Sequence, residues 1–119
     1  LLIDDNSAVV ESMGAWFKAE GHEIITASSG LEGIEQARRW EPDIVLLDIG
    51  LPDLDGYKVA RKLRQLPSGQ HLIIIALSGY AQSAKSKGAG DFDSYLIKPP
   101  KISELKKLIA HYRELKPVG

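Results

Sequence analysis

Four charged residues stand where apolar runs of the sequence stop. They are Asp4, Asp5, Asp48 and Lys98. Carboxylates brought close together repel one another unless a cation neutralises them. A hard divalent ion such as Mg²⁺ suits a small number of carboxylates, because it retains several of its waters. A carboxylate held beside such an ion can attack phosphorus and form an acyl phosphate, so these residue types indicate phosphoryl chemistry.

A hydroxyl and an ammonium would complete such a site. Lys98 offers a compact positive charge on a flexible stem, which suits a phosphate oxygen. Ser78 ends another apolar run and can donate a hydrogen bond to a second oxygen. A metal ion, a lysine and a hydroxyl around Asp48 would form a phosphoryl-transfer site, where the protein mainly positions groups and neutralises charge.

The segments between these residues alternate between the periods of strands and helices. Short, continuously apolar runs are typical of strands covered on both faces. Such strands are expected at 1–3, 23–27, 44–47, 72–77 and 95–97. Apolar residues at helical spacing predict helices over 9–17, 31–37, 57–65 and 105–112, and Ser29 and Glu32 have capping-box spacing. The stretch 78–90 is the least regular and contains Gly88 and Gly90. We therefore expect 81–90 to be mobile without phosphate and more ordered with it.

Strands that alternate with helices predict an α/β fold with right-handed crossovers. Five such units predict a doubly wound, five-stranded parallel sheet in the flavodoxin-like order 2-1-3-4-5, with helices on both faces. In such sheets the carboxyl ends of the strands share one edge, and ligands bind where the strand order reverses. The first and third strands flank that reversal, so the three carboxylates are expected within a few ångströms of one another.

The composition narrows the classes of protein that remain. A length of 119 residues fits one domain over 1–119, and a net charge of −1 argues against direct nucleic-acid binding. The absence of cysteine excludes disulfides, thiolate catalysis and zinc–cysteine sites. The apolar runs are too short to span a bilayer and no signal peptide is visible, so a cytoplasmic setting without membrane insertion is expected. The chain begins inside an apolar run without Met, which suggests either a segment of a longer protein or missing disordered ends.

Four stretches of the sequence resemble the receiver domains of two-component response regulators. They are Leu-Leu-Ile-Asp-Asp-Asn at 1–6, Val-Leu-Leu-Asp-Ile-Gly-Leu-Pro-Asp-Leu-Asp-Gly at 45–56, Ala-Leu-Ser-Gly at 76–79 and Tyr-Leu-Ile-Lys-Pro at 95–99. The match covers nearly the whole chain in the right order, and the combination is far more specific than any one stretch. The sequence around Asp48 looks most like receivers attached to hybrid sensor histidine kinases.

The resemblance implies a role for each acid. Asp48 matches the phosphoacceptor of the family. Asp5 matches the direct Mg²⁺ ligand, and Asp4 matches its neighbour, which often holds the metal through water. The backbone carbonyl of Gly50 matches the third protein ligand. Magnesium is therefore the expected cofactor.

The resemblance also implies how the phosphoryl group is held and used. Ser78 and Lys98 match the two groups that grip it, Tyr95 matches the aromatic switch residue, and the Lys98–Pro99 bond would be cis. The donor would be a histidine kinase or a histidine phosphotransfer domain, and the target a downstream effector protein or an attached domain. The domain would not be an enzyme, although it would assist its own phosphorylation and dephosphorylation.

Two other functions fit parts of the pattern. A receiver-like interaction module could bind a partner without phosphorylation, but the intact set of acids, serine and lysine argues against it. A hydrolase is weaker still, because no separate general base is apparent. Adjacent acids after a strand usually form a solvated turn. A site at Asp4 and Asp5 is favoured only because Asp48 and Lys98 stand at matching strand ends.

Other polar residues have simpler interpretations. Asp53 and Asp55 are expected to be loop and helix-start acids rather than calcium ligands, because Leu51 occupies the first ligand position. The basic face of the helix at 57–65 is expected to be solvated. It consists of Lys58, Arg61, Lys62 and Arg64.

Overall fold

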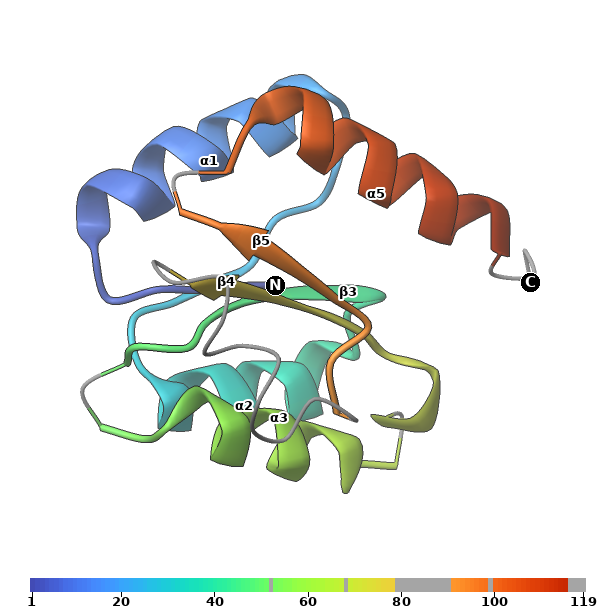
Figure 1. The fold of residues 1–119 in the computed structure, drawn as a ribbon. Helices are drawn as coiled ribbons and strands as arrows, with labels where there is room; N and C mark the ends of the chain where they lie inside the picture. The colour runs from blue at the N-terminus through green and yellow to red at the C-terminus, as the bar shows by residue number, and fades with distance from the viewer. Residues whose placement is uncertain (52, 68, 79–90, 99, 116–119) are drawn as a thin grey trace.

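Five parallel strands form one sheet in the order β2-β1-β3-β4-β5, as the alternating pattern predicts (Figure 1). The computed structural model describes residues 1–51, 53–67, 69–78, 91–98 and 100–115. The strands are β1 (Leu2–Ile3), β2 (Thr26–Ala27), β3 (Ile44–Asp48), β4 (Ile73–Ser78) and β5 (Ser94–Ile97). The segment 81–90, for which mobility without phosphate is expected, lies outside the described residues.

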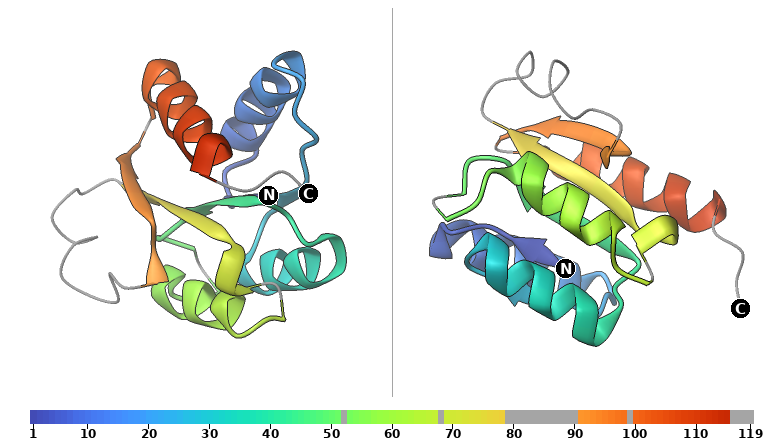
Figure 2. Two further views of the ribbon diagram at one scale, coloured as in Figure 1. Left: turned by 90° about the vertical axis from the view of Figure 1, so that its right-hand side faces the viewer. Right: turned by 90° about the horizontal axis from the view of Figure 1, so that it is seen from below.

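Helices cover both faces of the sheet, as Figures 1 and 2 show. One face carries α1 (Ser7–Ala19) and α5 (Ile102–Leu115), and the other carries α2 (Gly30–Trp40) and α3 (Gly56–Arg64). A short 3-10 turn, η1 (Gly69–His71), leads into β4. Within the described residues, no helix combines the length and apolar character needed to cross a bilayer.

The central strands are buried on both faces, which explains their continuously apolar sequences. All residues of β3 and β4 after the first are buried, and their apolar side chains divide between two hydrophobic clusters, one on each face. By contrast, β2 is shorter than the predicted strand at 23–27. It pairs with β1 through Thr26 and Ala27, and the Ile25 carbonyl also accepts a hydrogen bond from the Leu2 N–H at 2.8 Å.

Two helix starts follow signals that are visible in the sequence. The Ser29 hydroxyl accepts a hydrogen bond from the Glu32 N–H at 3.2 Å, as its capping-box spacing predicts. The Asp55 carboxylate accepts one from the Tyr57 N–H at 2.8 Å and begins α3, so its assignment as a helix-start acid is confirmed.

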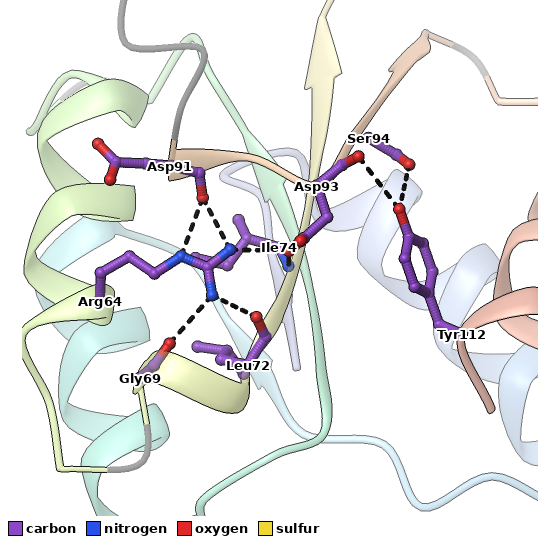
Figure 3. A network of polar contacts seen from close by, with 8 residues as sticks. All are labelled: Arg64, Gly69, Leu72, Ile74, Asp91, Asp93, Ser94 and Tyr112. Carbon is purple, nitrogen blue, oxygen red and sulfur yellow. Dashed lines mark hydrogen bonds and ion pairs between the residues drawn. The ribbon is translucent and has the colours of Figure 1, made fainter. Parts of the chain in front are cut away.

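Arg64 lies inside the fold rather than on a solvated basic face, so that prediction is wrong for this residue. Its side chain is 22 % exposed and forms an ion pair with Asp93 at 2.7 Å. Its guanidinium also donates hydrogen bonds to the backbone carbonyls of Gly69, Leu72 and Asp91 (Figure 3). The reason is positional, because α3 ends at Arg64, beside the segments that enter β4 and β5.

The Arg64 contacts continue across the sheet to α5. The Asp93 carboxylate also accepts a hydrogen bond from the Ile74 N–H at 2.8 Å. The Tyr112 hydroxyl donates to the Asp93 carbonyl at 3.1 Å and shares a hydrogen bond with the Ser94 hydroxyl at 2.6 Å (Figure 3). The start of β5 is therefore held from α3 on one face and from α5 on the other.

Replacing Arg64 should destabilise the fold far more than replacing its exposed neighbour Arg61. Arg64→Ala removes the donor to several backbone carbonyls and the cation paired with Asp93, so we expect the free energy of unfolding to fall by about 2–3 kcal/mol. Arg61→Ala should change it by less than about 0.5 kcal/mol. Urea unfolding followed by circular dichroism measures both. Equal, small effects would show that the network adds nothing to stability.

Candidate functional site

Strand register brings Asp4 and Asp48 side by side. Ile3 lies opposite Leu47 in the β1–β3 pair, so the next residue on each strand is an aspartate. Asp4 is fully buried and Asp48 nearly so, whereas Asp5, one residue further, is exposed. Oxygens of the three carboxylates all lie within 4.8 Å of one another. The expected acidic cluster is therefore present at the carboxyl edge of the sheet.

Lys98 reaches this cluster from the end of β5. Its backbone N–H donates to the Ser78 carbonyl at 2.8 Å, which fixes it beside the end of β4. Its Nζ lies 2.8 Å from Asp4 Oδ2 and 3.0 Å from Asp48 Oδ2. Asp4 Oδ2 is buried from solvent, so the ammonium is the group that neutralises it among the described residues. One cation thus joins β1, β3 and β5.

The two carboxylates keep Lys98 charged. Burial alone would lower the pKa of Lys98, but hydrogen bonds and charges from Asp4 and Asp48 outweigh it, and the net pKa lies above the ordinary value of 10.5. Because folding raises the pKa of Lys98, its protonation stabilises the fold fully at pH values below the pKa of the lysine in the unfolded chain. That contribution is lost only as the pH rises through the folded value, so the ion pairs persist across the neutral range.

The second oxygen of each buried carboxylate is held by a backbone N–H. The Gly50 N–H donates to Asp48 Oδ1 at 3.0 Å, and the Asn6 N–H donates to Asp4 Oδ1 at 2.9 Å. Asn6 also caps α1 through its side chain, so it couples the start of that helix to the site. Motif spacing alone does not single out Asn6, although an asparagine just before a helical pattern is a common cap signal.

The donor set fits a hard divalent cation. Three carboxylates face the single ammonium of Lys98, so negative charge is in excess at the cluster. Two oxygens bound to one Mg²⁺ are at most about 4.2 Å apart, which is close to the 4.8 Å within which the oxygens of these three carboxylates lie. Gly50 lies in the loop that follows Asp48, and its carbonyl is a candidate further oxygen ligand.

Ser78 and Tyr95 differ in their position relative to the charged cluster of Asp4, Asp5, Asp48 and Lys98. Ser78 is buried at the end of β4, next to the backbone of Lys98. Tyr95 is half-buried on the α2–α3 face, and its ring packs against Phe92 with centroids 5.6 Å apart. The pKa of Tyr95 is raised mainly by burial, and electrostatic interaction with Tyr57 and Asp91 raises it further. Tyr95 is not part of the charged cluster, and its switch role stays a prediction.

Comparison with known proteins identifies one family. A family model described as the response regulator receiver domain matches residues 1–110. The chain is 36 % identical over 106 residues to the cell cycle response regulator CtrA of Brucella ovis, which is 88 % of this chain and 45 % of that protein. The chain therefore spans less than half the length of the curated relatives it matches.

Solved structures give the same likeness in three dimensions. The receiver domain of sensor histidine kinase PA1611 from Pseudomonas aeruginosa, with magnesium coordinated in its active site cleft, has a TM-score of 0.85 at 28 % identity over 93 % of each chain. Response regulator TrrA from Thermotoga maritima, in complex with Mg²⁺ and BeF, also has a TM-score of 0.85 at 28 % identity. That match covers 93 % of this chain and 95 % of TrrA.

Removing the Lys98 charge should destabilise the metal-free protein. Lys98→Met leaves two buried carboxylates without a cation, so we expect a loss of about 2–3 kcal/mol at neutral pH. This loss of stability is smaller than the loss expected for a fully buried ion pair, because the Lys98 side chain is 25 % exposed. Saturating Mg²⁺ should narrow the difference, since it neutralises the same carboxylates.

Lys106→Met is the matched control for this measurement. Lys106 pairs with Glu20 at 3.2 Å, but its side chain is 59 % exposed. Its loss should therefore change stability by less than about 0.5 kcal/mol. Chemical unfolding with and without Mg²⁺ compares the two variants. A Lys98 variant as stable as the wild type without metal would contradict the charge balance described above.

Proposed function

The chain belongs to the response regulator receiver domain family, and we propose that Asp48 accepts a phosphoryl group from a phosphohistidine in a Mg²⁺-dependent reaction. The single observation that carries this proposal is the environment of Asp48. It is a nearly buried carboxylate at the carboxyl edge of the sheet, held at both oxygens and joined there by two further acids and a lysine. The domain acts as a phosphoacceptor that assists its own phosphorylation and dephosphorylation.

Magnesium is the proposed cofactor, since two structural relatives that are 28 % identical were crystallised with it. Asp5, Asp48 and the backbone carbonyl of Gly50 are the proposed protein ligands, and Asp4 holds the ion through water. When bound, Mg²⁺ neutralises the carboxylates and the phosphoryl oxygens that would otherwise repel them. Asp5 is exposed beside the buried Asp4, so its carboxylate can meet an ion that enters from solvent.

The chemistry of the transfer needs little from the protein beyond position. An Asp48 oxygen attacks phosphorus, the new P–O bond forms, and the N–P bond of the phosphohistidine breaks. The electron pair of that bond returns to the imidazole, which leaves. The Gly50 N–H at 3.0 Å orients the attacking carboxylate and keeps it from rotating. Such positioning and charge neutralisation are the main contributions a protein makes to phosphoryl transfer.

Lys98 and Ser78 are the residues proposed to bind the oxygens of the transferred phosphoryl group. The Lys98 Nζ already lies 3.0 Å from Asp48 Oδ2, so it can exchange a carboxylate oxygen for a phosphoryl oxygen with little movement. Ser78, at the end of β4, supplies a hydroxyl to a second oxygen. Tyr95 would then turn as the switch residue, and the phosphorylated state would shift an existing equilibrium between two conformations.

A histidine kinase or histidine phosphotransfer domain is the proposed donor. An apolar groove between α1 and α5 adjoins the site and shares Asn6 and Lys98 with it. Its other lining includes Met13, Pro100 and the half-exposed Ile102. A protein that presents a phosphohistidine to Asp48 would cover this groove as it does so. The output would pass to an effector protein or to an attached domain.

Phosphorylation by a small donor tests the proposed acceptor directly. Acetyl phosphate with Mg²⁺ should add one phosphoryl group to the wild type and none to Asp48→Asn, because the amide is not a nucleophile. Asp55→Asn removes an acid from the loop that follows Asp48 and should be labelled like the wild type. Intact-mass spectrometry measures all three. Labelling of the Asp48 variant to the wild-type level would disprove the assignment, whereas a wild type that takes up no phosphoryl group would favour the interaction module that does not use phosphorylation.

A further inference from the structure

Asp53 connects the loop after β3 to a helix that is distant in sequence. This loop, residues 49–55, carries Gly50. The Asp53 carboxylate accepts hydrogen bonds from the Gly30 N–H at 2.9 Å and from the Leu31 N–H at 3.0 Å. Both N–H groups belong to the first turn of α2, where no partner exists within the helix. The expectation that Asp53 is a loop acid is therefore incomplete, because it also caps a helix from 22 residues away.

The α2 helix has its own cap as well. The Ser29 hydroxyl accepts from the Glu32 N–H at 3.2 Å, so one N–H of the first turn has a local partner. Asp53 supplies partners for two others across the fold. The helix therefore receives a local and a long-range cap, and only the long-range one constrains the loop.

Close packing supports the same connection. A Cβ on Gly30 would lie 2.8 Å from a methyl carbon of Val59 on α3 and 3.1 Å from Leu54 Cβ in the loop, so a larger residue would push the start of α2 away from both. At the far end of the loop, the Gly56 N–H donates to the Ile49 carbonyl at 3.2 Å. The loop is thus closed at its base and tied to α2 near its middle.

We propose that Asp53 is a positioning residue of the metal site, which holds the loop 49–55 against α2 so that the Gly50 carbonyl stays available to the ion. This inference rests on the proposed function, in which Gly50 is a metal ligand. The link is direct along the chain, since Gly50 and Asp53 lie on one short loop and the Gly50 N–H also holds the acceptor carboxylate.

Charge makes this connection persistent. A carboxylate at the start of a helix is favoured by the partial positive charge of the free N–H groups. Hydrogen bonds from the N–H groups of Gly30 and Leu31 hold the pKa of Asp53 below its usual range. An asparagine has one oxygen acceptor in place of two, so Asp53→Asn keeps part of the connection and Asp53→Ala keeps none.

Calorimetric titration of the full chain with MgCl₂, without any phosphoryl donor, tests the proposal. Outer residues that orient metal ligands are typically worth 10–100-fold in metal affinity, so Asp53→Ala should weaken Mg²⁺ binding about tenfold. Asp53→Asn should fall between Asp53→Ala and the wild type. Amide hydrogen exchange of the metal-free protein should also show faster exchange at Gly50 in Asp53→Ala.

Two control variants separate this role from simpler ones. Ser29→Ala removes the local cap of α2 and should lower stability while leaving Mg²⁺ affinity close to that of the wild type. Asp55→Asn removes an equal charge from the same loop but retains an oxygen to cap α3, so it should also bind Mg²⁺ like the wild type. If Asp55→Asn weakens binding as much as Asp53→Ala, charge rather than position is responsible and the proposal is overturned.

The outcomes also distinguish this inference from the function on which it rests. A wild-type protein that binds no Mg²⁺ would overturn the proposed function, and this inference with it. A wild-type protein that binds Mg²⁺ with the same affinity as Asp53→Ala would leave the function intact and overturn the positioning role alone.

Discussion

Crowded negative charge at one edge of the sheet is the constraint on which the rest of the structure depends. Three carboxylates have oxygens within 4.8 Å of one another, and Asp4 and Asp48 are withdrawn from water. Such an arrangement persists only if a cation and hydrogen-bond donors compensate for it. Lys98 supplies the cation, and the backbone N–H groups of Asn6 and Gly50 supply donors. Under the proposed function, the same groups that stabilise the folded chain also prepare Asp48 for reaction.

Lys98 directly follows β5, so the charge balance at the carboxylates also fixes one end of this strand. The strand is fixed at its start by the contacts among Arg64, Asp93 and Tyr112, which come from helices on both faces (Figure 3). At its other end it is held by the ion pairs of Lys98 with Asp4 and Asp48. Only the second of these attachments involves the proposed phosphoacceptor. Under the proposed function, a new group on Asp48 changes the partners at one end of β5 while the other end stays fixed.

The sequence predicts the strand order and the charged cluster because both follow from local patterns. Apolar runs mark the strands, and the site residues come directly after those runs, so a parallel sheet brings them to one edge. Arg64 and Asp53 could not be assigned in this way, since the Asp53 partners lie 22 and 23 residues away, the carboxylate that pairs with Arg64 lies 29 residues away, and no period relates them.

The most direct test of the central claim, that Asp48 and the charges around it form one phosphoryl-binding site, is an NMR titration with beryllofluoride, a mimic of the phosphoryl group. With Mg²⁺ present, beryllofluoride should shift the backbone amide signals of Asp48, Ser78, Tyr95 and Lys98 in the wild type. The same addition should leave Asp48→Asn unchanged, because that variant lacks the carboxylate to which beryllium binds. A wild-type spectrum that does not respond, or equal shifts in the variant, would contradict the account.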